Sequence, residues 1–505
     1  MKSLKNIDIK HLLILFIVSL VITIPYFFYS PKQGLMAVLV LMVLALISKA
    51  LYGLVGVYSI LINLFFLHLV SKWGRNSLVS RIQASYESAT YERWEYFKSY
   101  FGLMDILLML AYVLAALFAI YYVIKLQKTT KFTRNISLLA SSVLIALSLL
   151  IFPTIETLRN FQLVHLPLSI YSTYENLSII NQREEFLKSV KKEKRHCPNS
   201  YDKIIFIQGE SVNKHHLTQY GYNRKTTPFL DSIKPYKFEA IAPANQTRFS
   251  IPIILTPASV DNFKVFYHSK SIVSLLSECG YTTYWISNQG KTGEYATTIT
   301  SIASEADHTY FLNDLDYTTA GLDGNILKQL DKIDTQKNNK QAIFIHLLGS
   351  HVSYSDRYPK EEALLKVSDK TPEENLIDHY DNSIYYTDKV ISEIYKRVNN
   401  EHALYIYLSD HGEVVSEMGH GFSPSFKEEY EIPLFIWSKE QEKIAKVFKE
   451  TNDKTINTES IFHIIKYLSG IDEKSELSYS SKVLSVLPEN IVDYLTLPKY
   501  SEKDH

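Results

Sequence analysis

Carboxylate and imidazole side chains follow short apolar segments in the second half of the chain. Glu210 comes directly after KIIFIQG, and Asp410 and His411 come directly after ALYIYLS. His351 follows QAIFIHLLGS, and His420 lies nine residues beyond His411. Carboxylate oxygens and imidazole nitrogens are ligands of Zn²⁺ or Mn²⁺ where thiolates are absent. The pattern predicts a metal site held by Glu210, Asp410 and His411, with a fourth ligand from elsewhere.

The segment PANQTRFSIP (243–252) carries hydroxyl groups that can complete such a site. A hydroxyl that coordinates a metal loses its proton more readily and becomes a nucleophile. Thr247 and Ser250 are both candidates for this alkoxide. Ser211 is a third hydroxyl, but it directly follows Glu210, and we expect it to cap a helix that begins there.

These residues need a scaffold that brings distant strand ends together. After Tyr201, short apolar runs alternate with helical patterns, and the runs are continuously apolar. Such strands, separated by helices, are typical of a mainly parallel sheet that is covered on both faces. Ligands bind these sheets outside the carboxyl ends of the strands. The sequence therefore predicts an α/β domain with the candidate residues at one edge of its sheet.

The first part of the chain has a different composition. Apolar runs long enough to cross a hydrocarbon core of about 30 Å occur at roughly 12–30, 35–51, 53–71, 105–124 and 136–155. Lysines precede the first run and basic residues fill the loop between the fourth and fifth, so both should face the cytoplasm. With five spans, the α/β domain lies on the outer side. No ionisable residue lies deep in a run, which disfavours transport.

These patterns divide the chain into four parts. Residues 1–155 are expected to form a five-helix transmembrane domain with an interfacial segment at 72–102. Residues 156–200 form a bridging linker, whose basic end is either solvated or lies against anionic headgroups. The catalytic domain is expected at 201–485, and 486–505 form a C-terminal tail.

Charge and cysteine content exclude several classes of protein. The chain has 53 basic and 53 acidic residues, so no overall positive field favours nucleic acid. Cys197 and Cys279 are too few for a disulfide framework and lack the spacing of a zinc or redox motif. They can form one bridge at most.

Several segments together resemble the bacterial phosphoethanolamine transferases of the sulfatase and alkaline phosphatase superfamily. The sequences of these motifs are most similar to those of family members that modify the lipopolysaccharide core. The matching segments are GESVNKHHLTQYGYNRKTTPFL (209–230), NQTRFSIP (245–252), WISNQGKTG (285–293), HLLGSHVSYSDRYP (346–359), YDNSIYYTD (380–388) and SDHGEVVSEMGHG (409–421). The five predicted spans match as well, so the resemblance covers nearly the whole chain. It implies a helical membrane domain followed by an alkaline phosphatase-like or sulfatase-like α/β domain in the periplasm.

The resemblance also implies roles for single residues. Glu210, Asp410 and His411 match zinc ligands, and Thr247 matches the threonine that binds the metal and accepts phosphoethanolamine covalently. His351 and His420 match histidines that bind the donor phosphate or a second zinc, and they could serve as general acid and base. The residues that match, or lie near, the donor-binding segment are Asn288, Gln289, Lys291 and Glu413.

The implied cofactor is one Zn²⁺, with a second Zn²⁺, or Mn²⁺ instead, left open. The implied donor is phosphatidylethanolamine, and the implied acceptor is lipopolysaccharide or lipooligosaccharide, with a core heptose favoured over a lipid A phosphate. We expect a monomeric, multi-pass protein of the bacterial inner membrane. Many relatives carry disulfide-bonded cysteines beside the nucleophile, and this chain has none around Thr247.

The sequence leaves one alternative reaction open and disfavours two other functions. A synthase of the lipoteichoic acid type would share the five spans and the threonine nucleophile but would use phosphatidylglycerol. A non-catalytic periplasmic scaffold is disfavoured, because the ligand set is complete. A hydrolytic sulfatase needs Cys or Ser in a C/S-x-P-x-R motif, and the nearest match, from Ser250 to Ile254, lacks the arginine.

Overall fold

The computed structural model separates the chain into two compact units, and each is described by itself. One unit comprises residues 1–82 and 101–174, and the other comprises 83–100 and 175–505. The structure describes residues 9–29, 31–73, 102–129, 182–198, 200–290, 297–313, 321–335, 339–367, 370–398, 400–415, 419–422 and 424–500.

The first unit contains helices at four of the five predicted spans. They are α1 (Ile9–Tyr29), α2 (Pro31–Ile47), α3 (Lys49–Trp73) and α6 (Leu103–Thr129). Among the described residues, α6 is the one helix long and apolar enough to cross a membrane, over Leu103–Lys125, and the other three contain shorter apolar stretches. The run at 136–155 and nearly all of the segment at 72–102 lie outside the described residues. Five spans therefore stay a prediction.

A polar contact ties three of these helices together. In α1, which contains Pro25, the carbonyl of Ile22 accepts hydrogen bonds from Asn63 Nδ2 of α3 at 3.0 Å and from the Tyr112 hydroxyl of α6 at 2.7 Å. Asn63 is fully buried. An amide in an apolar bundle needs such partners, so this contact also sets how the helices face one another.

The second unit is built on an eight-stranded sheet in the order β4-β3-β5-β1-β6-β7-β2-β8. Its strands are β1 (Lys203–Gly209), β2 (Tyr236–Ile241), β3 (Thr282–Ser287), β4 (His308–Phe311), β5 (Gln341–His346), β6 (Ala403–Ser409), β7 (Glu431–Ser438) and β8 (Ile456–Asn457). The strands from β4 to β6 are parallel, and β7 is antiparallel to both of its neighbours. The prediction of a mainly parallel α/β domain is confirmed.

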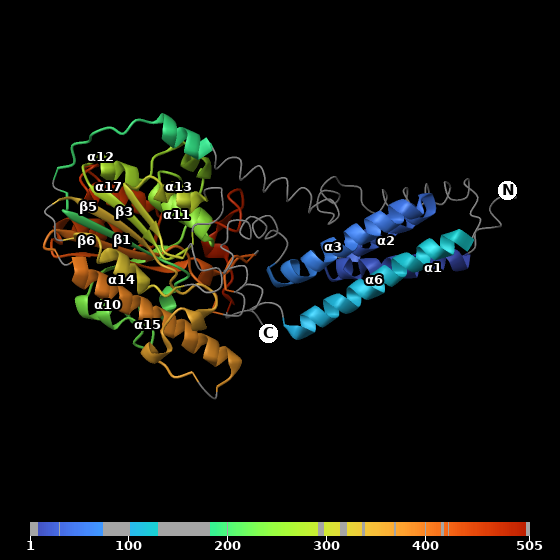
Figure 1. The fold of residues 1–505 in the computed structure, drawn as a ribbon. Coiled ribbons are helices and arrows are strands. Elements are labelled where there is room, and N and C mark those ends of the chain that lie inside the picture. The colour runs from blue at the N-terminus through green and yellow to red at the C-terminus, as the bar shows by residue number, and fades with distance from the viewer. Residues whose placement is uncertain are drawn as a thin grey trace. The chain divides into compact units, whose positions relative to one another are not determined.

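Helices cover both faces of this sheet (Figure 1). On one side lie α11 (Thr247–Leu255), α12 (Ile272–Glu278), α13 (Thr298–Ala303) and α17 (Ser460–Leu468), and on the other α10 (Pro228–Ile233), α14 (Asn325–Leu330) and α15 (Pro372–Val398). In β1, Ile204 and Phe206 join the core under the first layer, whereas Ile205 and Ile207 join the core under the second. Alternate side chains of a strand point to opposite faces, which explains why the strand is apolar throughout.

The described end of the linker packs on the second unit. Residues 182–189 are helical, and the buried guanidinium of Arg183 donates to Ser269 O at 2.8 Å and pairs with Glu305. Arg195 pairs with Glu278 at 2.6 Å. Cys197 and Cys279 form a disulfide bond. This part of the linker is therefore held by ion pairs within the protein.

The segment after residue 485, which we expected to form a tail, also packs on this unit. β10 (Ile491–Asp493) pairs antiparallel with β9 (Lys482–Leu484). The backbone N–H of Tyr500 donates to the carboxylate of Glu428 at 3.0 Å. The α/β unit thus extends at both ends beyond the predicted range of 201–485.

Candidate active site

The register of two neighbouring strands brings the predicted metal ligands together. β1 and β6 are parallel, with Gly209 opposite Ser409, so Glu210 and Asp410 leave the sheet side by side. Glu210, Asp410 and His411 are all buried, and one ligand atom from each lies within 4.8 Å of the others. Residues 200 positions apart in sequence therefore form one cluster.

The donor set fits a divalent metal such as Zn²⁺. His411 Nε2 lies 3.2 Å from Glu210 Oε1 and 3.4 Å from Asp410 Oδ2. Asp410 Oδ2 is buried and accepts no hydrogen bond from the described residues. His411 Nδ1 lies 2.8 Å from Gly412 O, so this nitrogen carries the hydrogen and leaves Nε2 as a ligand.

The charges of the cluster favour a cation as well. Burial and the negative charge of Glu210 raise the pKa of Asp410 to about 7. Burial alone would lower the pKa of His411, but the carboxylates of Asp410 and Glu210 outweigh it and raise the pKa to about 10. The imidazole is therefore protonated beside the two carboxylates when no metal is bound. A divalent ion would replace this proton.

Thr247, the first residue of α11, reaches this cluster. Its Oγ1 lies 3.2 Å from Glu210 Oε2 and 3.3 Å from His411 Nε2, and the residue is partly exposed. Ser250 is fully buried, and its hydroxyl donates to the backbone carbonyl of Asp410. Of the two hydroxyls that the sequence left open, the geometry favours Thr247 as the nucleophile.

Ser211 does not cap a helix, which corrects our expectation. Its φ is 58°, and its hydroxyl donates to Glu210 Oε1 at 2.9 Å. The next helical turn, η2 (Lys214–His216), is capped by Asn213, whose side chain accepts from the N–H of His215. The chain turns sharply after β1, so Ser211 supports the carboxylate beside it.

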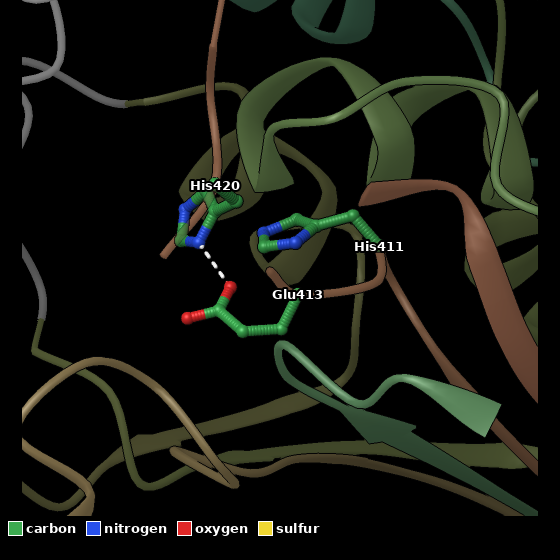
Figure 2. A group of neighbouring side chains, drawn as sticks. All are labelled: His411, Glu413 and His420. Carbon is green, nitrogen blue, oxygen red and sulfur yellow. Dashed lines mark hydrogen bonds and ion pairs between the residues drawn. The ribbon is translucent and has the colours of Figure 1, made fainter. Parts of the chain in front are cut away.

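The histidine that follows the metal cluster is held by a carboxylate. His420 Nδ1 lies 2.7 Å from Glu413 Oε2, and Figure 2 shows the two side chains pointing toward each other beside His411. The rings of His411 and His420 are 4.0 Å apart between centroids, and those of His351 and His420 are 6.0 Å apart. His411, Glu413 and His420 form a second group that could hold a metal ion.

The residues expected to bind the donor have different surroundings. Asn288 is buried, and its amide donates to Gly321 O and Asp323 Oδ1, both at 2.8 Å. Gln289 is half-buried and donates to Glu210 Oε2 at 3.1 Å, so it touches the metal cluster. Lys291 lies outside the described residues. Asn288 therefore connects its own loop to residues 321–323, whereas Gln289 donates a hydrogen bond to Glu210, a predicted metal ligand.

Two further residues hold the site and were not predicted. Asp323 is buried and accepts the N–H groups of Leu348 and Gly349, just before His351. The Tyr354 hydroxyl donates to Glu413 Oε1 at 2.6 Å. Tyr354 lies within the matched segment 346–359, but no sequence signal singles out either residue, because both act through contacts between distant segments.

The family model described as Sulfatase matches residues 202–471, more than half of the chain. The chain belongs to the sulfatase family. The resemblance to the phosphoethanolamine transferases of the sulfatase and alkaline phosphatase superfamily is also confirmed by several such proteins among its relatives. Membership of the sulfatase family describes the fold of this chain. At Ser250–Ile254, the nearest match to the hydrolytic sulfatase motif, Ile254 stands in the position of the arginine.

Relatives match different shares of this sulfatase-family chain. YhbX of Escherichia coli K12 is 29% identical over 287 residues, which cover 55% of this chain and 50% of YhbX. Phosphoethanolamine transferase EptC of the same strain is 24% identical over 449 residues, covering 79% of this chain and 76% of EptC. Phosphoethanolamine transferase EptA of Helicobacter pylori is 29% identical, covering 53% of this chain and 54% of EptA. The chain thus spans about half the length of several relatives.

Among the solved structures that share the fold are two phosphoethanolamine transferases. The C-terminal periplasmic domain of Escherichia coli EptC, in complex with zinc, has a TM-score of 0.55 at 23% identity, covering 62% of this chain and 99% of that domain. The integral membrane protein lipooligosaccharide phosphoethanolamine transferase A of Neisseria meningitidis has a TM-score of 0.63 at 16% identity, covering 92% of this chain and 95% of that protein.

Proposed function

We propose that this protein transfers phosphoethanolamine from phosphatidylethanolamine to lipopolysaccharide or lipooligosaccharide, with a core heptose as the favoured acceptor and a lipid A phosphate next. The observation that carries the proposal is the Thr247 hydroxyl, 3.2 Å from Glu210 Oε2 and 3.3 Å from His411 Nε2. Relatives named phosphoethanolamine transferases support the transferred group.

Thr247 is the proposed nucleophile. Zinc bound by Glu210, Asp410, His411 and Thr247 would lower the pKa of the threonine hydroxyl and offset negative charge on phosphorus oxygens. Thr247 Oγ1 attacks the phosphorus of the donor, the bond from phosphorus to the diacylglycerol oxygen breaks, and that oxygen takes a proton. An acceptor hydroxyl or phosphate then attacks the phosphorus of the phosphoethanolamine ester on Thr247, the bond from phosphorus to Oγ1 breaks, and Oγ1 takes up the proton that the acceptor gives up.

His351 and His420 are the proposed partners of the phosphate oxygens and of the leaving oxygen. A histidine can give a proton to the departing alkoxide and take one from the incoming acceptor. Glu413 orients His420 through the 2.7 Å contact with Nδ1. The N-terminus of α11, a nine-residue helix that begins at Thr247, adds backbone N–H groups that favour a phosphate there.

The proposed location is the inner membrane, with the catalytic unit in the periplasm and the protein a monomer. A bilayer lipid as donor explains why an enzyme of this kind needs an anchor, and α6 supplies a helix that could cross the membrane. The Cys197–Cys279 disulfide supports an oxidising compartment for the catalytic unit.

The test is the intact mass of the purified full-length protein after incubation with zinc and phosphatidylethanolamine. We expect one phosphoethanolamine adduct in the wild type and in Ser250→Ala, and none in Thr247→Ala. Loss of the adduct only in Ser250→Ala would overturn the assignment of Thr247. A glycerophosphate adduct formed only with phosphatidylglycerol would indicate the lipoteichoic acid type of reaction. No adduct from either lipid would favour a non-catalytic scaffold.

A further inference from the structure

A buried carboxylate outside the metal cluster connects two segments of the active site. Glu429 precedes β7 and has no solvent exposure. It lies outside all six segments that resemble the transferases, and the hydrogen bonds of its side chain go to Asn245, Gly421, Phe422 and Phe426 and not to the proposed metal ligands. Neither the resemblance nor the predicted metal site accounts for a buried carboxylate at this position.

On one side, Glu429 binds the loop that carries His420. Its Oε2 accepts the backbone N–H of Gly421 at 2.6 Å and that of Phe422 at 3.0 Å. Its Oε1 accepts the N–H of Phe426 at 2.8 Å. Since Gly421 directly follows His420, these hydrogen bonds fix the backbone from which the histidine extends.

On the other side, Glu429 binds the segment that carries the nucleophile. Asn245 Nδ2 donates to Glu429 Oε2 at 2.9 Å, two residues before Thr247. Asn245 is also fully buried, and its Oδ1 accepts the N–H of Val486 at 2.9 Å. The amide therefore joins the nucleophile segment both to Glu429 and to the chain beyond β9.

The backbone of Glu429 completes the connection to the metal cluster. Its carbonyl accepts the N–H of Gly412, the residue after His411, at 2.8 Å. A Cβ at Gly412 would collide with the carbonyl of Glu428, so the two backbones are in close contact. One residue thus contacts three segments, which carry Thr247, His411 and His420.

We propose that Glu429 is a positioning residue for the transfer reaction: its buried carboxylate, together with Asn245, holds the Thr247 segment and the His420 loop at a set separation. The inference rests on the proposed function. Four N–H donors surround this carboxylate, and a glutamine would turn an NH₂ group toward at least one of them. An error of about 1 Å between reacting groups can slow a reaction about 100-fold.

The test compares Glu429→Gln with Asp388→Asn in the full-length protein. Asp388 is a matched control, since it is a buried carboxylate that accepts two backbone N–H groups, from Phe229 and Leu230, and contacts neither segment of the site. The measurements are the rate of phosphoethanolamine adduct formation over a range of phosphatidylethanolamine concentrations, and the zinc content of each purified protein.

We expect Glu429→Gln to lower the maximal rate about 10- to 100-fold, with the half-saturating lipid concentration and the zinc content little changed. Asp388→Asn should react within about twofold of the wild type. A wild-type rate in Glu429→Gln, or an equal loss in both variants, would overturn the inference. If the wild type forms no adduct, the proposed function itself fails.

A second variant keeps the inference testable if Glu429→Gln does not fold. Asn245→Ala removes the link between Glu429 and the nucleophile segment but leaves the three backbone N–H donors of the His420 loop in place. It should also slow adduct formation about 10-fold or more. A wild-type rate in Asn245→Ala would contradict the positioning role.

Discussion

At the scale of the residue, the site depends on side chains that hold other side chains. Thr247 and His420 are proposed to meet the substrate and His411 to hold the metal, and both histidines are oriented by groups that take no part in the proposed reaction. Gly412 O sets the tautomer of His411, and Glu413 sets the direction of His420. Such partners determine how closely the reacting groups are held, and their removal slows a reaction without removing a reacting group.

The Tyr354 hydroxyl, which donates to Glu413 at 2.6 Å, is a partner of this kind. We expect Tyr354→Phe to slow phosphoethanolamine adduct formation about 10-fold and to lower the free energy of unfolding by about 1 kcal/mol, since Glu413 loses one hydrogen bond in a buried site. The zinc content should not change. The measurement is the adduct rate by intact mass, beside the metal content.

The control is Tyr358→Phe. Tyr358 is also buried, and its hydroxyl contacts His379 and Asn382, away from Glu413. This variant should react at the wild-type rate. Equal slowing in both variants would show that loss of any buried hydroxyl in this region has the same effect, and would refute the specific role of Tyr354.

At the scale of the element, β7 connects the sheet to the C-terminal segment. Glu431, its first residue, lies 3.0 Å from His215 Nε2 of η2 and accepts the hydroxyl hydrogen of Tyr494 at 2.6 Å. Tyr494 begins the last turn of helix, η8 (Tyr494–Thr496), just after β10. One carboxylate thus joins three elements from different parts of the chain.

This carboxylate predicts a pH dependence of stability. Burial alone would raise the pKa of Glu431, but the hydrogen bonds from His215 and Tyr494 outweigh it and lower the pKa to about 2, from an ordinary value of 4.5. The folded state therefore favours the ionised form. The stabilisation, up to about 3 kcal/mol, is complete above about pH 4.5 and is lost as the pH falls toward 2.

We expect Glu431→Gln to unfold more easily than the wild type at pH 7, with a difference that shrinks when both are measured at pH 3. Thermal unfolding of the full-length protein in detergent, followed by near-UV circular dichroism, measures the difference. Glu489→Gln, at an exposed position, is the control and should match the wild type at both pH values. A constant difference for Glu431→Gln would contradict the assignment.

At the scale of the whole molecule, the α/β unit reaches beyond the segment that the family model matches. Before residue 202, the linker is held by Arg183 and by the Cys197–Cys279 disulfide. After residue 471, Val486 binds Asn245 beside the nucleophile. The ends of this unit therefore stabilise the site as well as the fold.

The disulfide spans 82 residues of sequence. In the chain-entropy account, closing a loop of this length stabilises the folded state by about 4.5 kcal/mol. We expect Cys197→Ala with Cys279→Ala to lower the unfolding temperature of the catalytic unit, while the adduct rate at low temperature stays within about twofold of the wild type. An unchanged unfolding temperature, or a loss of rate without loss of stability, would contradict this prediction.

The α/β fold class and the grouping of Glu210, Asp410 and His411 could both be predicted from the sequence. Continuous apolar strands predict a parallel sheet because both of its faces are covered, and such a sheet collects its strand ends at one edge, where Glu210, Asp410 and His411 meet. Side-chain periodicity is a local property, and parallel strands end at one edge in every sheet of this kind, so both features can be predicted from the sequence.

Contacts between distant segments could not be predicted from the sequence. Ser250 donates to a backbone carbonyl, and the buried Asn288 donates to Asp323. Glu429 lies between the Thr247 segment and the His420 loop. No periodicity marks these residues, because their partners lie far away in sequence and are chosen by packing. Ser250 and Thr247 both carry hydroxyls on α11, and only the direction of each side chain distinguishes the structural hydrogen bond of Ser250 from the proposed nucleophile Thr247.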